Sequence, residues 1–160
     1  AATGINVDPD RNVIVTAGNM QAVNALLHTA LDPGDEVIVT DPGFSSHIQQ
    51  IRLCGGKPVY WRLDEEAGWA LDVDALSGLI TDRTRAIILV SPSNPTGNIF
   101  SRDDLIKVGE LKSRLLETVF NGLSGKAGIV LFSGKSLLLR SSNEFAVLKQ
   151  RGRAIVIVGR

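Results

Sequence analysis

Short runs of aliphatic and β-branched residues alternate along this chain with segments in which apolar residues recur at helical spacing. Such alternation favours a largely parallel sheet, because parallel neighbours need a crossover connection, usually a helix. The run 86–90 is apolar without interruption, as is typical of a strand covered on both faces. We therefore predict an α/β fold with three layers, α-β-α, and a mostly parallel sheet.

Proline and glycine mark the boundaries of the expected elements. Asp72 is placed to cap a helix, and Ser101 with Asp104 three residues later resembles a capping box. The predicted strands are 13–16, 36–40, 57–63, 86–90, 129–132 and 155–158, and the predicted helices are 20–31, 45–53, 73–80, 101–119 and 141–150.

Length and composition indicate one ordinary domain, since the chain has 160 residues of which 44% are hydrophobic. No stretch of about 18 apolar residues is present, and the first residues lack the pattern of a signal peptide. We therefore expect a cytoplasmic protein without membrane contact. The single cysteine, Cys54, excludes an internal disulfide and a cysteine-based zinc site, and is expected to be a small buried hydrophobe. No metal site is expected.

The zero net charge conceals an asymmetry between two parts of the chain. Residues 1–110 carry 15 acidic and 8 basic side chains, whereas residues 111–160 carry 2 acidic and 9 basic ones. All six prolines also lie in the first part. We therefore place a boundary near Leu111 and expect the basic remainder to pack on the same sheet.

Ligands of such folds gather where loops leave the carboxyl ends of the strands. In the first of these loops, Gly18 permits close backbone approach, and the amides of Asn19 and Met20 open a helix whose dipole favours an anion. In the second loop, Phe44 is either a core residue or a platform for a flat ligand. Each signal taken alone is weak.

The third loop, residues 91–97, follows the most apolar strand. Two prolines restrict its backbone, so the side chain of Asn94 is held in a fixed direction and can donate to an oxygen anion. Because these residues are also common turn formers, the alternative is a turn without a ligand.

The loops and their neighbours form a series of motifs in a definite order. They are Thr16-Ala17-Gly18-Asn19-Met20, Leu31-Asp32-Pro33-Gly34-Asp35-Glu36-Val37, Asp41-Pro42-Gly43-Phe44, Gly55-Gly56, Asp82-Arg83-Thr84-Arg85-Ala86 and Ser91-Pro92-Ser93-Asn94-Pro95-Thr96-Gly97. This order resembles the class I/II pyridoxal-phosphate-dependent aminotransferases of fold type I, over about two thirds of the chain. The resemblance implies the three-layer large domain of that family.

The resemblance also implies a role for each loop. Gly18, Asn19 and Met20 would bind the phosphate of pyridoxal 5'-phosphate, and Phe44 would stack on its pyridine ring. Asn94 would bond the ring hydroxyl oxygen, often before a cis proline, here Pro95. The implied reaction is amino transfer between an amino acid and a 2-oxo acid, in a protein that is usually a homodimer.

Two parts of the family pattern are not found in this sequence. The family's acid, in an Asp-Glu-x-Tyr run, would end the strand at 129–132, where the sequence reads Ser133-Gly134-Lys135. The family's Ser-x-x-Lys run would follow strand 155–158, and the flanks of Lys135 do not fit that motif. We therefore expect residues 1–110 to be a partial large domain that is inactive as an isolated fragment, and identify no catalytic residue.

Two other functions agree with parts of this sequence. The chain is alternatively a noncatalytic module for phosphate binding or assembly, or a nucleotide-binding domain around Lys135. Gly134-Lys135-Ser136 is similar to part of a P-loop, but the first glycine of that motif would fall on Ile129. The basic residues near the end lack interleaved aromatic side chains, so no nucleic-acid partner is expected. His28 and His47 are expected to serve packing or the surface, although His47 lies close to the predicted ring site.

Overall fold

A computed structural model describes residues 14–101, 103–108, 128–133, 136–140, 149–150 and 153–156 of the protein. Its main sheet has five strands in the order β3-β2-β4-β5-β6. The strands are β2 (Glu36–Asp41), β3 (Lys57–Arg62), β4 (Thr84–Ser91), β5 (Gly128–Ser133) and β6 (Ser136–Arg140). The first four in the sheet are parallel and β6 is antiparallel to β5, so the predicted mostly parallel sheet is confirmed.

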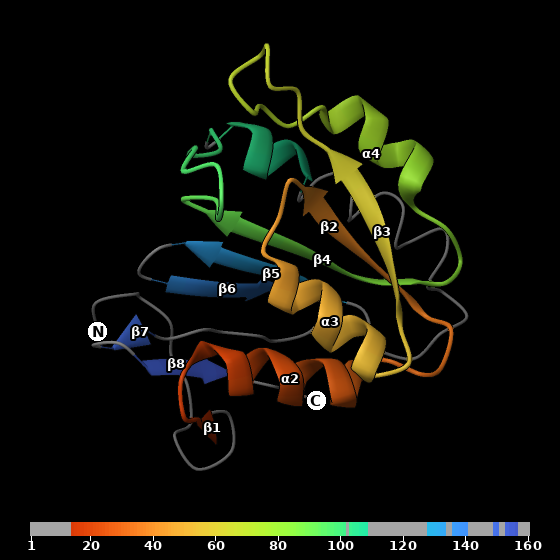
Figure 1. Ribbon diagram of the computed structural model, residues 1–160, viewed down its shortest axis with the longest axis vertical. Coiled ribbons are helices and arrows are strands. Elements are labelled where there is room, and N and C mark those ends of the chain that lie inside the picture. The colour runs from red at the N-terminus through yellow and green to blue at the C-terminus, as the bar shows by residue number, and fades with distance from the viewer. Residues whose placement is uncertain are drawn as a thin grey trace.

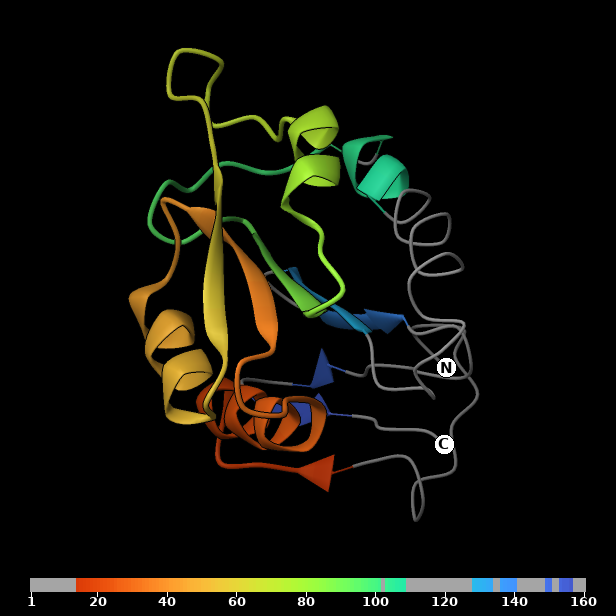
Figure 2. The same cartoon turned by 90° about the vertical axis from the view of Figure 1, so that its right-hand side faces the viewer.

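Helices cover both faces of this sheet. On one face lie α2 (Asn19–Ala30) and α3 (Ser45–Leu53), and on the other lie α4 (Val73–Leu79) and the helix 103–108 (Figures 1 and 2). The three-layer architecture expected from the alternating pattern is therefore present. The predicted helix 101–119 can be compared only over its first turns, because residues 109–119 lie outside the described part.

Alternate residues of the central strands build two separate cores. Val37 and Val39 of β2 and Ile88 of β4 pack with α2 and α3, whereas Ile38 and Ile87 pack with the opposite layer. Each fully buried aliphatic side chain contributes about 1.5–3 kcal/mol of transfer free energy, so these strands anchor the sheet. Their continuous apolar sequence reflects this burial on both faces, as predicted for 86–90.

Local capping signals are confirmed. A carboxylate oxygen of Asp72 accepts a hydrogen bond from the Ala75 amide at 3.0 Å. The hydroxyl of Ser101 accepts from the Asp104 amide at 3.0 Å and donates to the Asp104 carboxylate at 2.6 Å. Gly55 closes α3 with φ +80°. These short-range patterns therefore fix where the helices begin and end.

The second half of the chain departs from the prediction in two places. The predicted helix 141–150 is wrong at its end, because Lys149–Gln150 is strand β7, and residues 141–148 lie outside the described part. The strand expected at 155–158 is β8 (Arg153–Val156), which pairs antiparallel with both β7 and β1 (Ile14–Val15) in a second sheet. The paired residues Gln150 and Arg153 are only three positions apart in the sequence.

Strand β6 has no counterpart in the prediction. It returns antiparallel along β5, with Ser133 opposite Ser136. The sequence signal was present, because Gly134 lies in a two-residue connection between two apolar runs. No helix among the described residues is long and apolar enough to cross a membrane.

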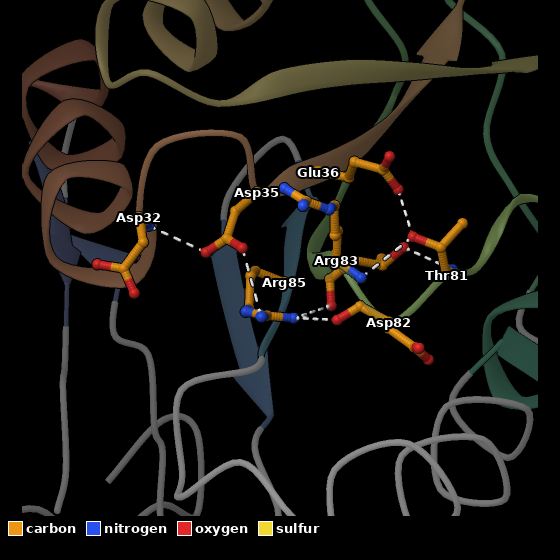
Figure 3. A network of polar contacts seen from close by, with 8 residues as sticks. Asp32, Asp35, Glu36, Thr81, Asp82, Arg83 and Arg85 are labelled. Atoms are coloured by element: carbon orange, nitrogen blue, oxygen red, sulfur yellow. Dashed lines mark hydrogen bonds and ion pairs between the residues drawn. The ribbon is translucent and has the colours of Figure 1, made fainter.

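Charged side chains form a network at the amino edge of the sheet, where β2 and β4 begin (Figure 3). Asp35 pairs with Arg85 at 3.3 Å and also accepts from the backbone amide of Asp32 at 2.9 Å. Arg85 in turn donates to the backbone carbonyl of Asp82 at 2.7 Å, and Thr81 donates to Glu36 at 2.5 Å. This edge is therefore stabilised by mutually satisfied polar groups.

Candidate cofactor site

The opposite, carboxyl edge of the sheet carries two of the three predicted loops. Strands β2 and β4 are parallel neighbours, with Val39 beside Ile88, so both end on the same side. The loop 42–44 leaves β2 and the loop 92–97 leaves β4 there (Figure 1). A ligand at this edge can therefore meet residues from both loops.

The first loop is a tight turn into α2. Gly18 is the N-cap with φ +87°, its amide donates to the Thr16 carbonyl at 2.8 Å, and the Thr16 hydroxyl donates to the Gly18 carbonyl at 3.0 Å. A Cβ placed on Gly18 would meet nothing within 4 Å, so the space beside this turn is open. The amides of Asn19 and Met20 belong to the first turn, where helices leave amides without intrahelical acceptors. With no acidic side chain in that turn, the site suits an anion.

The second loop depends on a close backbone contact at Gly43. A Cβ on this residue would lie 2.2 Å from the carbonyl oxygen of Thr40, so only glycine fits the turn. Phe44 follows as the half-buried N-cap of α3. Its ring meets the ring of His47 edge to face, with centroids 5.2 Å apart and an interplanar angle of 86°.

His47 supports Phe44 from within the protein. Its side chain is 4% exposed, and burial lowers the pKa of His47 from 6.5 to about 4. The imidazole is therefore neutral at pH 7 and brings no positive charge against the ring of Phe44. The sequence placed His47 near the predicted ring site, but its burial depends on the packing of α3 against the sheet.

The third loop presents Asn94 and Pro95 at the surface, and the peptide bond between them is cis as the resemblance implies. The bonds before Pro42 and Pro92 are also cis. Asn94 forms no hydrogen bond with Gly18 or Phe44 within the described residues. The loops that contain Phe44 and Asn94 share one edge of the main sheet, whereas the Gly18 turn follows β1 of the second sheet and opens α2.

Asn98, which the sequence alone did not indicate as a site residue, closes this third loop. Its backbone carbonyl accepts from the Ser93 amide at 2.8 Å, and its side-chain amide donates to the Trp69 carbonyl at 2.9 Å. The Thr96 hydroxyl also donates to the side-chain oxygen of Asn98. Asn98 directly follows the motif of residues 91–97, but its role depends on a contact with the distant segment that contains Trp69. The local sequence pattern does not indicate that contact.

Two buried polar atoms near these loops have no hydrogen-bond partner among the described residues. They are the hydroxyl oxygen of Ser93, in the third loop, and the side-chain oxygen of Gln50, in α3. Buried polar groups are normally satisfied, and exceptions mark places that a water or ligand completes. The open turn at Gly18, the exposed Asn94 and these atoms are compatible with a phosphorylated ring compound at this edge.

Comparison with known proteins agrees with this interpretation. The sequence model of "Aminotransferase class I and II" matches residues 2–120. An aspartate aminotransferase of Streptomyces avermitilis is 40% identical over 107 residues, covering 67% of this chain and 26% of that protein. Human kynurenine–oxoglutarate transaminase 1 is 36% identical over 118 residues, covering 68% of this chain and 28% of its own.

Solved structures give the same result. Aspartate aminotransferase of Thermus thermophilus with maleate has a TM-score of 0.66 at 37% identity, covering 69% of this chain and 29% of that one. The aspartate aminotransferase of Rhizobium meliloti has a TM-score of 0.68 at 32% identity, covering 81% and 30%. The fold is thus that of the pyridoxal-phosphate-dependent transferases. The chain belongs to the class I and II aminotransferase family, and it spans about a quarter to a half of the length of the curated relatives it matches.

The described part offers no lysine at the candidate site. Among the residues whose side chains are described, the lysines are Lys57, which begins β3 at the amino edge, and Lys107, which pairs with Asp104 at 3.9 Å. Lys135 lies outside the described residues. No group of three or more His, Cys, Asp or Glu side chains in the described part is arranged to hold a metal ion.

Proposed function

We propose that this chain carries the cofactor-binding loops of a pyridoxal-phosphate-dependent aminotransferase and binds pyridoxal 5'-phosphate at the carboxyl edge of its sheet. The observation that carries this proposal is the open Gly18 turn at the start of α2, at the same side of the fold as the loops that contain Phe44 and Asn94 (Figure 1). The phosphate of the cofactor needs a helix start with free amides, its ring needs an aromatic platform, and its ring oxygen needs a hydrogen-bond donor.

Each loop then has a defined task. The amides of Asn19 and Met20, beside the open Gly18 turn, bind the phosphate, Phe44 covers the ring, and Asn94, ahead of Pro95, donates to the ring oxygen. When bound, the cofactor supplies the electron sink for amino transfer between an amino acid and a 2-oxo acid. The neutral His47 packs against Phe44 and helps to keep it in place without bringing a charge near the cofactor ring.

We further propose that residues 1–110 form a partial large domain, that residues 111–160 are a divergent basic extension, and that these 160 residues do not catalyse transfer alone. The sequence has neither the Asp-Glu-x-Tyr run nor a fitting lysine motif. The site residues therefore bind and orient the cofactor, while the amine that would link to it is missing from the described edge.

The test is a titration of the 160-residue chain with pyridoxal phosphate, followed by borohydride treatment and mass spectrometry. We expect saturable binding, a raised melting temperature, no stoichiometric lysine adduct and no amino transfer. A chain that fails to bind pyridoxal phosphate contradicts the cofactor site. A stoichiometric adduct on Lys135 contradicts the proposed inactivity.

A second candidate is a noncatalytic module that binds the phosphate compound or joins a partner. It is favoured by apolar side chains exposed at two of the loops, Met20 at 38% and Ile99 at 75%. In the full-length family the expected partner is a second copy. Light scattering tests this candidate: a homodimer supports an assembly role, whereas a monomer at every concentration tested opposes it.

A nucleotide site around Lys135 is less well supported by the geometry. A P-loop leads from a strand into a helix, whereas strand β6 follows residues 134–135. An unchanged melting temperature at saturating ATP would remove this candidate.

A further inference from the structure

Gln50 joins the two helices that follow the first and second loops of the proposed site. Its side-chain amide donates a hydrogen bond of 2.8 Å to the backbone carbonyl of Met20, although the two residues are 30 positions apart. Met20 lies in the first turn of α2, beside the Gly18 turn, and Gln50 lies in α3, the helix that Phe44 caps. The bond therefore connects the helix start proposed to hold phosphate with the helix that carries the ring platform.

The surroundings of Gln50 make a purely stabilising role a poor explanation. The side chain is 8% exposed, and its oxygen is buried without a hydrogen-bond partner in the described part of the chain. A buried acceptor left unsatisfied opposes folding, and an apolar side chain of similar size would avoid that cost. What an apolar side chain cannot do is hold the Met20 carbonyl.

The helices themselves show what this bond fixes. α2 and α3 lie on the same face of the sheet and side by side (Figures 1 and 2). Apolar contacts between helices tolerate small shifts, whereas a hydrogen bond with defined length and angle does not. Without Gln50, the start of α2 is held against α3 by apolar packing alone, through side chains such as Ala22 and Val23.

We propose that Gln50 is a positioning residue that sets the distance between the phosphate-binding turn and Phe44, so that phosphate and ring are held at the same time. This inference rests on the proposed function. It predicts that Gln50 acts on the contribution of the phosphate to affinity, and not on affinity for the ring alone.

The test compares pyridoxal phosphate with pyridoxal, which lacks the phosphate, on the same 160-residue chain. We define the phosphate advantage as the dissociation constant for pyridoxal divided by that for pyridoxal phosphate. Gln50→Met preserves side-chain length and removes the donor. It is expected to lower the phosphate advantage about fivefold, as the loss of one hydrogen bond allows, with little change for pyridoxal.

Gln49→Met is the matched control, because Gln49 is the exposed neighbour on the same helix. Its phosphate advantage should stay within about twofold of the wild type. An unchanged advantage in Gln50→Met overturns the inference, as does an equal loss for both ligands, which a merely structural role would produce. A wild-type chain that shows no phosphate advantage instead contradicts the proposed function itself.

Hydrogen exchange on the wild-type chain covers the case in which Gln50→Met does not fold. Inorganic phosphate is expected to contact only the α2 turn, so an increase in protection of the amides around Gln50 in α3 that exceeds the general increase in other buried elements shows the coupling. Protection confined to the start of α2 contradicts it.

Discussion

The two edges of the main sheet are built from different chemistry. At the amino edge, Asp35 and Arg85 are paired at 3.3 Å and each has a further hydrogen-bond partner (Figure 3). At the carboxyl edge, Asn94 is exposed and the hydroxyl of Ser93 is buried without a partner among the described residues. At the amino edge these charged groups are paired within the protein, whereas the carboxyl edge keeps polar groups without such partners among the described residues. Polar groups of this kind are expected where a ligand binds.

This difference predicts that changes at the amino edge alter stability and leave ligand binding intact, while exposed residues at the carboxyl edge do the reverse. The largest effect should follow Arg85→Met. It leaves the carboxylate of Asp35 buried without its cation, so the free energy of unfolding should fall by about 3–5 kcal/mol in a urea titration.

Lys107→Met is the control for that prediction, because the Lys107–Asp104 pair is mostly exposed and its loss should cost no more than about 1 kcal/mol. Below its melting temperature, Arg85→Met should still bind pyridoxal phosphate like the wild type. Equal losses from the two ion pairs would contradict the structural importance of the amino edge.

The next effect concerns pH. Because burial lowers the pKa of His47 to about 4, the unfolded chain takes up a proton near pH 6.5 while the folded chain does not. Stability from the neutral histidine is thus present above pH 6.5 and lost as the pH falls toward 4, by on the order of 3 kcal/mol.

His47→Gln should flatten this part of the curve of unfolding free energy against pH. The other histidine, His28, is exposed on α2, so His28→Gln should keep the wild-type slope. A slope that disappears with His28 and persists without His47 would reverse the assignment.

A smaller effect is expected from Asn98→Leu. The change removes the side-chain bond to the Trp69 carbonyl and the bond from Thr96, so unfolding should become easier by about 1–2 kcal/mol. Thermal melting would measure the loss. Since the loop also orients Asn94, the affinity for pyridoxal phosphate should fall as well, and an unaltered affinity would show that Asn98 does not control the loop.

The smallest effect on stability should come from Asn94→Leu, the same substitution four residues earlier in the loop. Asn94 is exposed, so the free energy of unfolding should stay within about 0.5 kcal/mol of the wild type. Affinity for pyridoxal phosphate should nevertheless fall about tenfold through loss of the donor to the ring oxygen, measured by titration. Full affinity in this variant would contradict the proposed role of Asn94.

The sequence predicted the elements whose signals are local. Helix α3 begins at Ser45 and ends at Leu53 as expected, because the turn at Pro42-Gly43 precedes it and Gly55 follows it. Asp72 caps α4 as its position suggested. Strand β7 was predicted as the end of a helix, and the antiparallel pairing of β8 was not recognised, because β8 also pairs with β1, more than a hundred residues earlier. Such pairing depends on contacts that no short window of sequence contains.

The candidate site shows the same division. Gly18, Phe44 and Asn94 could be singled out because each belongs to a loop with an unusual local composition. Gln50 and Asn98 could not, since their meaning lies in carbonyl groups of Met20 and Trp69 that are distant in the chain. The residues proposed to touch the ligand were predicted, and those that hold them in place were found only in the fold.

The position of β3 at the rim of the main sheet has a consequence for how copies of this protein can meet. Its outer side offers backbone groups to which another extended segment could add, the usual start of uncontrolled aggregation. Pro58 lacks one of the required N–H groups, and the exposed cations Lys57 and Arg62 stand at the two ends of the strand, where a second copy laid antiparallel would bring like charges together. The rim of this sheet thus discourages polymer growth and lies apart from the loops of the candidate site.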